Sequence, residues 1–128
     1  MTISNIIIPV QTIPPQVIVS ETAGTTPILI NELKRICACE STWNPISEPQ
    51  HFNIDGSVLR GEVNPSDIGQ CQINTKYWGE LADELGYDLF DKDDNIRMAQ
   101  YIYDIKGNAP WYLSKKCWNN FPVVQLAE

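Results

Sequence analysis

The chain has 128 residues, a hydrophobic fraction of 43% and a formal net charge of −7. This length is typical of a single domain, and this apolar content supports a folded core rather than a disordered chain. Nucleic acid is not an expected partner, because phosphate binding requires clustered Lys and Arg and this chain is acidic. No apolar run reaches the length of a membrane-spanning helix.

The N-terminal part, residues 1–25, is rich in Ile, Val, Thr and Pro, and Pro14-Pro15 prevents a helix there. We expect an extended segment over residues 1–25, a globular domain over residues 26–120 and a short tail over residues 121–128. The first basic residue is Lys34, so no charged region precedes the early isoleucines as it would in a signal peptide. We therefore expect that a targeting segment was removed or that the chain reaches its destination by another route.

The first helix is predicted to begin at Thr26-Pro27, because threonine can cap a helix and proline fits its first turn. Its apolar face, at helical spacing, consists of Leu29, Leu33, Ile36, Cys37 and Glu40. The helix is expected to end before Asn44-Pro45. A carboxyl group in line with a buried face loses hydration, which raises its pKa. The alternative is that Glu40 turns into solvent at the helix end.

A polar region with many turn signals follows over residues 46–65. Asp55-Gly56 lies between two short alternating segments within residues 52–59, which predicts a β-hairpin. His51 comes just before this hairpin, and we expect it to be a solvated loop residue. A compact segment from Ser66 to Asn74 comes next and contains Asp67.

Three further helices are predicted in the second half of the chain. One extends over residues 75–85, with Thr75 as its cap and a glycine as its stop. Another begins after Asp91, where acidic residues suit a helix N-terminus, and ends at Gly107. The last is a short helix over residues 109–118.

Four cysteines in a small acidic domain suggest two disulfides, for which three connectivities are possible. Cys37 and Cys39 lie two positions apart on a helix, so their side chains point about 200° apart and should not bond each other. The alternative is a zinc site built from Cys37, Cys39, His51 and either Cys71 or Cys117. Its spacing matches no standard zinc pattern, so neither a metal nor another cofactor is expected.

Three motifs occur in a fixed order: Cys-Glu-Ser at the end of the first helix, Asp-Gly-Ser in the hairpin, and Ser-Asp-Ile-Gly-Gln-Cys-Gln-Ile-Asn over residues 66–74. Together they resemble the lysozyme-like superfamily, and the pattern is similar to small lytic transglycosylases of the soluble-lytic-transglycosylase type. The segment from Asp67 to Asn74 also resembles c-type lysozymes. The resemblance covers roughly Pro27 to Trp118. The Tyr-Asn-Ala-Gly motif of many transglycosylases is missing, and the hairpin region is longer than in c-type lysozymes.

The resemblance implies an α+β fold that is mostly helical, with a small antiparallel β-hairpin region lining an active-site cleft. It implies that Glu40 is the catalytic acid and Asp67 the second carboxylate. It also implies a sugar-binding groove formed by Gln72, Asn74, Tyr77, Trp78, Tyr101 and Trp111. Two of these assignments have alternatives from the residues alone: Asp67 can cap residues 68–73 through an Asx turn, and Trp78 can belong to the core. We expect Trp43 and Trp118 to pack in the interior.

The function that this resemblance implies is cleavage of the β-1,4 bond between N-acetylmuramic acid and N-acetylglucosamine in peptidoglycan. A lytic transglycosylase with Glu40 as its single catalytic group is favoured over a hydrolytic lysozyme that uses Glu40 and Asp67. A non-catalytic glycan-binding or structural module is the third alternative. Peptidoglycan glycan strands are then the partner, and we expect a monomer.

The same resemblance suggests the disulfide Cys39–Cys117, because a c-type lysozyme bonds a cysteine near its C-terminus to the helix of the catalytic acid. Cys37–Cys71 is expected as the second bond, because the segment around Cys71 should pack beside Glu40. Disulfides form in an oxidising compartment, so the expected location is extracytoplasmic: the periplasm, the cell wall or the secreted fraction.

Overall fold

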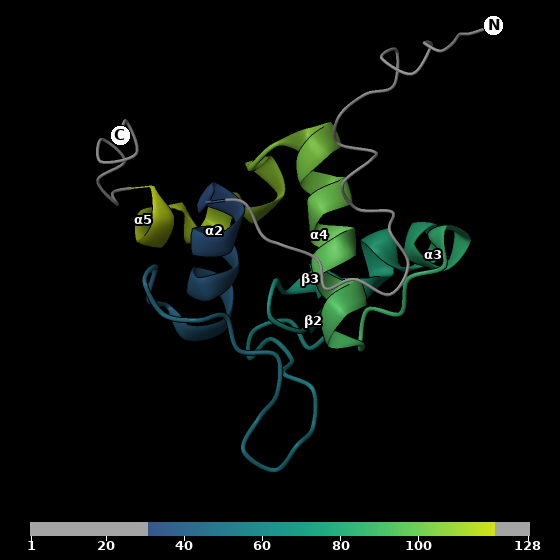
Figure 1. The fold of residues 1–128 in the computed structure, drawn as a ribbon, viewed down its shortest axis with the longest axis horizontal. Helices are drawn as coiled ribbons and strands as arrows, with labels where there is room; N and C mark the ends of the chain where they lie inside the picture. Colours follow the sequence, from purple (N-terminus) through teal and green to yellow (C-terminus); the bar gives the residue numbers. More distant parts are fainter. Residues whose placement is uncertain (1–30, 120–128) are drawn as a thin grey trace, which may run out of the picture.

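The computed structural model describes residues 31–119, and Figure 1 shows their arrangement. The elements in chain order are α2 (Asn31–Thr42), β2 (Asp67–Ile68), β3 (Ile73–Asn74), α3 (Thr75–Leu85), α4 (Lys92–Lys106), the 3-10 helix η2 (Ala109–Ser114) and α5 (Lys115–Trp118). This part of the chain is mostly helical with a small antiparallel sheet, in agreement with the predicted α+β class. The expected segments 1–25 and 121–128, and the predicted helix start at Thr26-Pro27, lie outside the described residues. No helix among residues 31–119 is long and apolar enough to cross a membrane.

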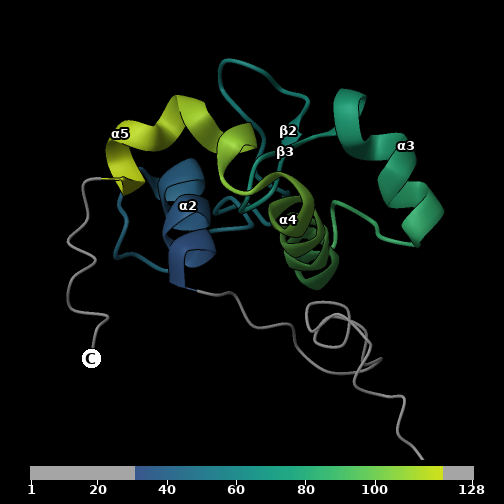
Figure 2. The same cartoon turned by 90° about the horizontal axis from the view of Figure 1, so that it is seen from above.

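Helix α2 is at the centre of the core. Its side chains Leu33, Ile36 and Cys37 are fully buried, as the helical spacing of apolar residues predicts, and Cys39 outside that predicted face is buried as well. The helix contacts α4, η2 and α5. Both views place α5 against α2, with α4 between α2 and α3 (Figures 1 and 2). Burying each aliphatic side chain of α2 contributes about 1.5–3 kcal/mol to the free energy of folding, so the buried face of this helix holds it in the core.

The helix ends follow local signals in the sequence. Gly86 ends α3 in the left-handed conformation with a φ of 83°, and Gly107 ends α4. The Asp91 side chain caps α4 by accepting a hydrogen bond from the backbone N–H of Asp94. The predicted cap at Thr75 is wrong by one position, because the side chain of Asn74 accepts the hydrogen bond at the start of α3.

The β region differs from the prediction. The expected hairpin over residues 52–59 is reduced to a single antiparallel bridge between Phe52 and Val58. The sheet lies further along the chain, where β2 and β3 pair antiparallel with Ile68 opposite Ile73. Both isoleucines are buried, whereas residues 53–57 are exposed. Strands persist where one face enters the core, so the pairing is longer at β2 and β3 than in the exposed hairpin.

The final predicted helix consists of two parts. Residues 109–114 form the 3-10 helix η2 and residues 115–118 form the short helix α5, with non-helical backbone angles at Trp111. The Trp111 indole is buried, and its Nε1 donates a hydrogen bond to the carbonyl oxygen of Cys71 at 2.9 Å. This contact with the β region turns Trp111 inward and interrupts the regular helix.

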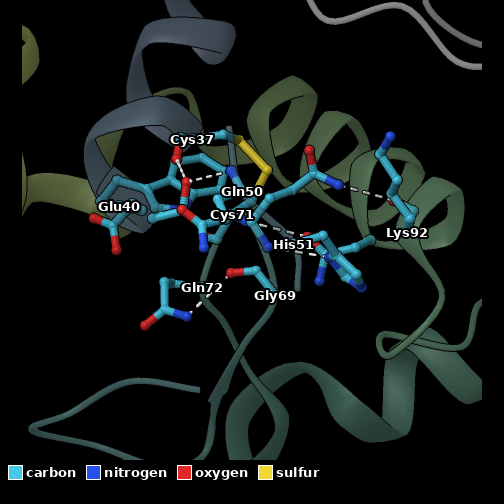
Figure 3. Close-up of a disulfide and its surroundings, with 12 residues drawn as sticks. Cys37, Glu40, Gln50, His51, Gly69, Cys71, Gln72 and Lys92 are labelled. Atoms are coloured by element: carbon cyan, nitrogen blue, oxygen red, sulfur yellow. Dashed lines mark hydrogen bonds between the residues drawn. A yellow bond between two sulfur atoms is a disulfide. The ribbon is translucent and has the colours of Figure 1, made fainter. Parts of the chain in front are cut away.

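Both predicted disulfides are present. Cys37 bonds Cys71, and Cys39 bonds Cys117. They join α2 to the turn between β2 and β3 and to α5, and Figure 3 shows the first of them between the two segments. All four cysteines are therefore oxidised, and the thiolates that the zinc alternative requires are not free.

A buried polar network holds the turn between β2 and β3 against α4. Asn95 is fully buried: its Nδ2 donates to the carbonyl oxygens of Ile68 and Leu89, and its Oδ1 accepts from the backbone N–H of Cys71. Gly69, at the turn, has a φ of 78°, and a Cβ atom there would lie 2.4 Å from Asn95 Nδ2. Only glycine fits this position, since both the backbone angle and the space exclude a side chain.

The expectation that His51 is a solvated loop residue is wrong. Its side chain is only 3% exposed. The ring lies between two backbone groups: Nε2 donates to the carbonyl oxygen of Phe90 at 2.8 Å, and Nδ1 accepts from the N–H of Gln70 at 3.2 Å. His51 therefore belongs to the same support for the turn as Asn95.

Candidate active-site cleft

Two adjoining cavities lie where α2 meets the β region, with volumes of about 280 Å³ and 490 Å³. Four polar residues line both of them: Glu40, Asn64, Asp67 and Gln72. The smaller cavity continues towards η2, and the larger one continues along the end of α2 and residues 59–63. The two cavities therefore form one cleft with a polar centre, and the two acids Glu40 and Asp67 both belong to that centre.

Glu40 lies in the last turn of α2, where the apolar face of the helix meets the cleft. Its side chain is partly buried and lines both cavities, while its helix neighbours Cys37 and Cys39 are in the core. Glu40 is therefore neither inside the core nor turned fully into solvent, the two positions considered from the sequence. The disulfides at these two cysteines hold the helix on either side. The carboxyl group therefore sits on a rigid support at the wall of the cleft.

The environment of Glu40 favours its protonated form. Burial is the main cause that raises the pKa of the Glu40 carboxyl to about 7; a hydrogen bond from Ser114 acts against it, and the negative charge of Asp67 adds to it. A carboxylic acid with this pKa keeps a large part of its protons near neutral pH. It can therefore act as a general acid there, which an ordinary glutamic acid cannot do.

Ser114 is the hydrogen-bonding partner of Glu40. Its Oγ donates to Glu40 Oε2 at 2.5 Å and also lies 3.1 Å from the carbonyl oxygen of Trp111. The indole Nε1 of Trp118 donates to the same Oγ at 3.0 Å. Because Ser114 Oγ accepts a hydrogen bond from Trp118, its own O–H is free to donate to Glu40. This donated bond stabilises the charged form of the Glu40 carboxyl.

Asp67 is oriented by the sheet. It lies opposite Asn74 in the register of β2 and β3, and its Oδ1 accepts a hydrogen bond from Asn74 Nδ2 at 2.9 Å. Asn74 Oδ1 accepts from the backbone N–H of Tyr77 at the start of α3. The Asn74 amide therefore fixes the Asp67 carboxyl relative to α3, and both side chains line the smaller cavity.

Gln72 closes the turn between the strands at the centre of the cleft. Its backbone has a φ of 50°, and its Nε2 donates to the carbonyl oxygen of Gly69 at 3.0 Å. In Figure 3 the Glu40 and Gln72 side chains extend on the same side of the Cys37–Cys71 disulfide. Gln72 lines both cavities together with Glu40.

The aromatic residues expected in the groove have different places. Trp111 and Trp78 line the smaller cavity. Tyr77 is 70% exposed and packs edge-on against Trp78, with ring centroids 4.8 Å apart. Tyr101, on α4, packs against the core and lines neither cavity. The structure therefore brings the two tryptophans to the cleft together with Glu40, Asp67, Gln72 and Asn74, and it leaves the two tyrosines outside the lining.

The site residues expected from the sequence include neither Asn64 and Trp43, which line the cleft, nor Ser114, which contacts Glu40 from outside the lining. Asn64 lines both cavities, but its place before Pro65 indicated only a turn. Ser114 contacts a residue 74 positions earlier, which no local pattern reveals. Trp43 lines the larger cavity and is 59% exposed, so the expectation that it packs in the interior is wrong, whereas Trp118 is buried as expected.

The chemistry of the cleft comes from acids and amides. Among residues 31–119, no group of three or more His, Cys, Asp or Glu side chains is arranged to hold a metal ion. A carboxylic acid with a raised pKa can donate a proton to a leaving group, and a second carboxylate at the same cavity wall can stabilise positive charge that develops beside it.

In comparisons with protein-family models, curated proteins and solved structures, nothing matches this chain.

Proposed function

We propose that the chain is a peptidoglycan-cleaving muramidase of the lysozyme-like superfamily, and that Glu40 is its catalytic acid. The observation that carries the proposal is the Glu40 carboxyl in the cleft wall, where burial raises its pKa to about 7. The motif order around Glu40 and Asp67, which resembles the superfamily, gives the substrate class. Cleavage of the β-1,4 bond after N-acetylmuramic acid is the reaction.

In the favoured route the products carry a 1,6-anhydro ring. Protonated Glu40 gives its proton to the glycosidic oxygen as the bond from this oxygen to the anomeric carbon breaks. The Glu40 carboxylate then takes the proton of the muramic acid 6-hydroxyl while O6 bonds the anomeric carbon. The acid ends the cycle protonated and no water is consumed, so one carboxyl group is sufficient for a lytic transglycosylase.

Hydrolysis is the second candidate, and the position of Asp67 favours it. Asp67 lines both cavities together with Glu40, and Asn74 holds its carboxyl group in place. A carboxylate at this position can stabilise an oxocarbenium-like sugar or attack it, and water then completes the reaction. In this route Glu40 is again the acid, and Asp67 becomes essential.

The test is digestion of purified peptidoglycan by the wild-type protein and by Glu40→Gln. We expect Glu40→Gln to lose at least a hundredfold in rate, because a general acid contributes about 10²–10⁴-fold. The glutamine keeps the shape of the side chain, so the fold should be intact by circular dichroism. Cleavage by Glu40→Gln at the wild-type rate would contradict the proposal.

Mass spectrometry of the released fragments separates the two routes, because anhydro ends are one water lighter than reducing ends. With anhydro products, Asp67→Asn should retain far more activity than Glu40→Gln. Reducing ends combined with an equal collapse in Asp67→Asn would assign the hydrolytic route. If the wild-type protein binds glycan strands and releases no fragments, the chain is a binding module instead.

The two disulfides support a location outside the cytoplasm, because disulfides form and persist in oxidising compartments. Peptidoglycan lies outside the cytoplasm, so the compartment in which these bonds persist is also the one that holds the proposed substrate. The proposed location is therefore the periplasm, the cell wall or the secreted fraction.

A further inference from the structure

Trp43 has an unusual backbone conformation for a large residue. It follows the last residue of α2 with a φ of 57°, in the left-handed region where glycine is the ordinary choice at a helix end. Bulky residues in this region are outliers that cost about 1–2 kcal/mol. Its side chain is 59% exposed, so interior packing does not account for the tryptophan. Strain of this kind is concentrated at binding and catalytic sites.

The strained conformation is held firmly by hydrogen bonds at the end of α2. The backbone N–H of Trp43 donates to the carbonyl oxygen of Cys39 at 2.9 Å. Thr42 Oγ1 donates to the carbonyl oxygen of Ala38 at 2.6 Å and accepts from the N–H of Asn44 at 3.1 Å. Because Cys39 is itself tied to α5 by a disulfide, the base of the indole is fixed three residues after Glu40.

The indole lines the larger cavity, on the opposite arm of the cleft from Trp111. Trp111 and Trp78 belong to the smaller cavity only, and Trp43 belongs to the larger one only. Glu40 and Asp67 are among the residues common to both. The cleft therefore has an aromatic surface on each side of its two acids, separated by polar side chains.

We propose that Trp43 is a stacking platform for a sugar ring on the α2 side of the cleaved bond, so that the cleft holds a glycan strand across both sides of Glu40. This inference rests on the proposed function for the class of ligand. One face of a pyranose ring presents C–H groups and its rim presents hydroxyls. An exposed indole on a fixed backbone supplies the apolar area for that face, and Asn64 and Gln72 at the centre supply polar contacts for the rim.

The platform also explains the presence of a tryptophan at a position where the backbone favours glycine. An aromatic side chain on a backbone that is fixed before the ligand arrives loses less conformational entropy on binding than one on a flexible segment, which strengthens affinity. A flexible residue at position 43 would remove the strain and also the preorganised surface. We therefore expect Trp43 to make the end of α2 less stable and the binding of the glycan tighter.

The test uses the Glu40→Gln protein, which should bind without cleaving, and β-1,4-linked N-acetylglucosamine hexamer as the probe. Trp43→Ala in this background should weaken binding of the hexamer at least tenfold by calorimetry. Trp43→Tyr keeps an aromatic face and should weaken it by less than threefold. Tyr112→Ala is the matched control, since Tyr112 is a 65% exposed aromatic residue that lines neither cavity, and it should bind as tightly as its parent.

Trp43→Gly separates binding from stability. Glycine relieves the left-handed backbone, so Trp43→Gly should melt at a higher temperature than Trp43→Ala while binding the hexamer as weakly. Wild-type affinity in Trp43→Ala would overturn the platform and leave the proposed function standing. A wild-type protein that binds the hexamer through Trp43 but leaves peptidoglycan intact would overturn the proposed function alone. If the Glu40→Gln parent protein does not measurably bind the hexamer, the platform is overturned.

Discussion

The position of Glu40 in the cleft wall suits proton donation, because burial disfavours the charged form of its carboxyl group. Burial raises its folded-state pKa from 4.5 to about 7, so the folded protein holds this proton more tightly than the unfolded chain does. The stabilising contribution is complete below pH 4.5 and is lost as the pH rises through 7. At about 1.4 kcal/mol for each unit of pKa, the loss is roughly 3 kcal/mol at alkaline pH.

Glu40→Gln should therefore be more stable than the wild-type protein at pH 8 and nearly equal to it at pH 4. The expected difference at pH 8 is up to roughly 3 kcal/mol, because glutamine carries no charge to bury. Urea unfolding at several pH values measures it. Equal stability of the two proteins across this range would show that the carboxyl group is freely hydrated, and it would remove the physical basis for its role as an acid.

Ser114 lowers the pH at which Glu40 loses its proton, against the larger effect of burial. The hydroxyl donates to the Glu40 carboxylate and lowers its pKa, so Ser114→Ala should raise the pKa further above its usual range. The falling limb of the pH–activity profile should then move to higher pH. Ser41→Ala is the matched control, because the Ser41 hydroxyl donates to the carbonyl oxygen of Cys37 instead. A shift of the limb that is the same in both variants would contradict the assignment.

At the level of elements, the turn between β2 and β3 is held by α4 as well as by the pairing of its own strands. Asn95 satisfies three backbone groups of this region, at Ile68, Cys71 and Leu89. The nearly isosteric Asn95→Leu leaves them without partners in the core and should cost about 3 kcal/mol or more. Asn53→Leu, at an exposed position, should change stability by less than about 0.5 kcal/mol. Thermal or urea unfolding compares the two, and similar losses would refute the special role of Asn95.

Local signals in the sequence were sufficient for helices α3 and α4 and for their limits, apart from the cap residue of α3. Gly86 and Gly107 end helices because glycine adopts backbone angles that other residues avoid, and Asp91 caps α4 through a side chain three positions from its partner. The apolar face of α2 likewise depends only on spacing along one helix. These features rest on residues within a few positions of one another, so they can be predicted without the fold.

The features that sequence reasoning missed depend on contacts between distant residues. His51 is buried because Phe90, 39 positions later, and Gln70 both bond its ring. The strands β2 and β3 have two residues each and are too short to show an alternating pattern. For the disulfides, the helical spacing of Cys37 and Cys39 excluded one of the three connectivities, and a family resemblance was needed to choose between the other two.

For the molecule as a whole, the two disulfides add covalent stability to the packed core. Cys37–Cys71 closes a separation of 34 residues and Cys39–Cys117 one of 78. In the chain-entropy model each contributes about 4 kcal/mol, a large part of the 5–15 kcal/mol that is usual for a domain.

Replacing either pair of cysteines by alanine should lower the free energy of unfolding by about 4 kcal/mol, with the longer loop costing roughly 0.7 kcal/mol more. Denaturant unfolding of both double variants measures this order. Non-reducing peptide mapping checks that the remaining bond is the native one. A variant pair as stable as the wild-type protein would show that the disulfides add nothing to the folded state.

The placement of the disulfides also decides what proteolysis does to the chain. Both bonds begin on α2, and the last cysteine lies near the end of the described residues, so every peptide bond between Cys39 and Cys117 lies inside a covalent ring. The exposed loop at Ile54 is the natural place for a protease to enter. A cut there leaves two fragments that stay joined, and the nicked protein would migrate as a single species until a reductant releases its halves.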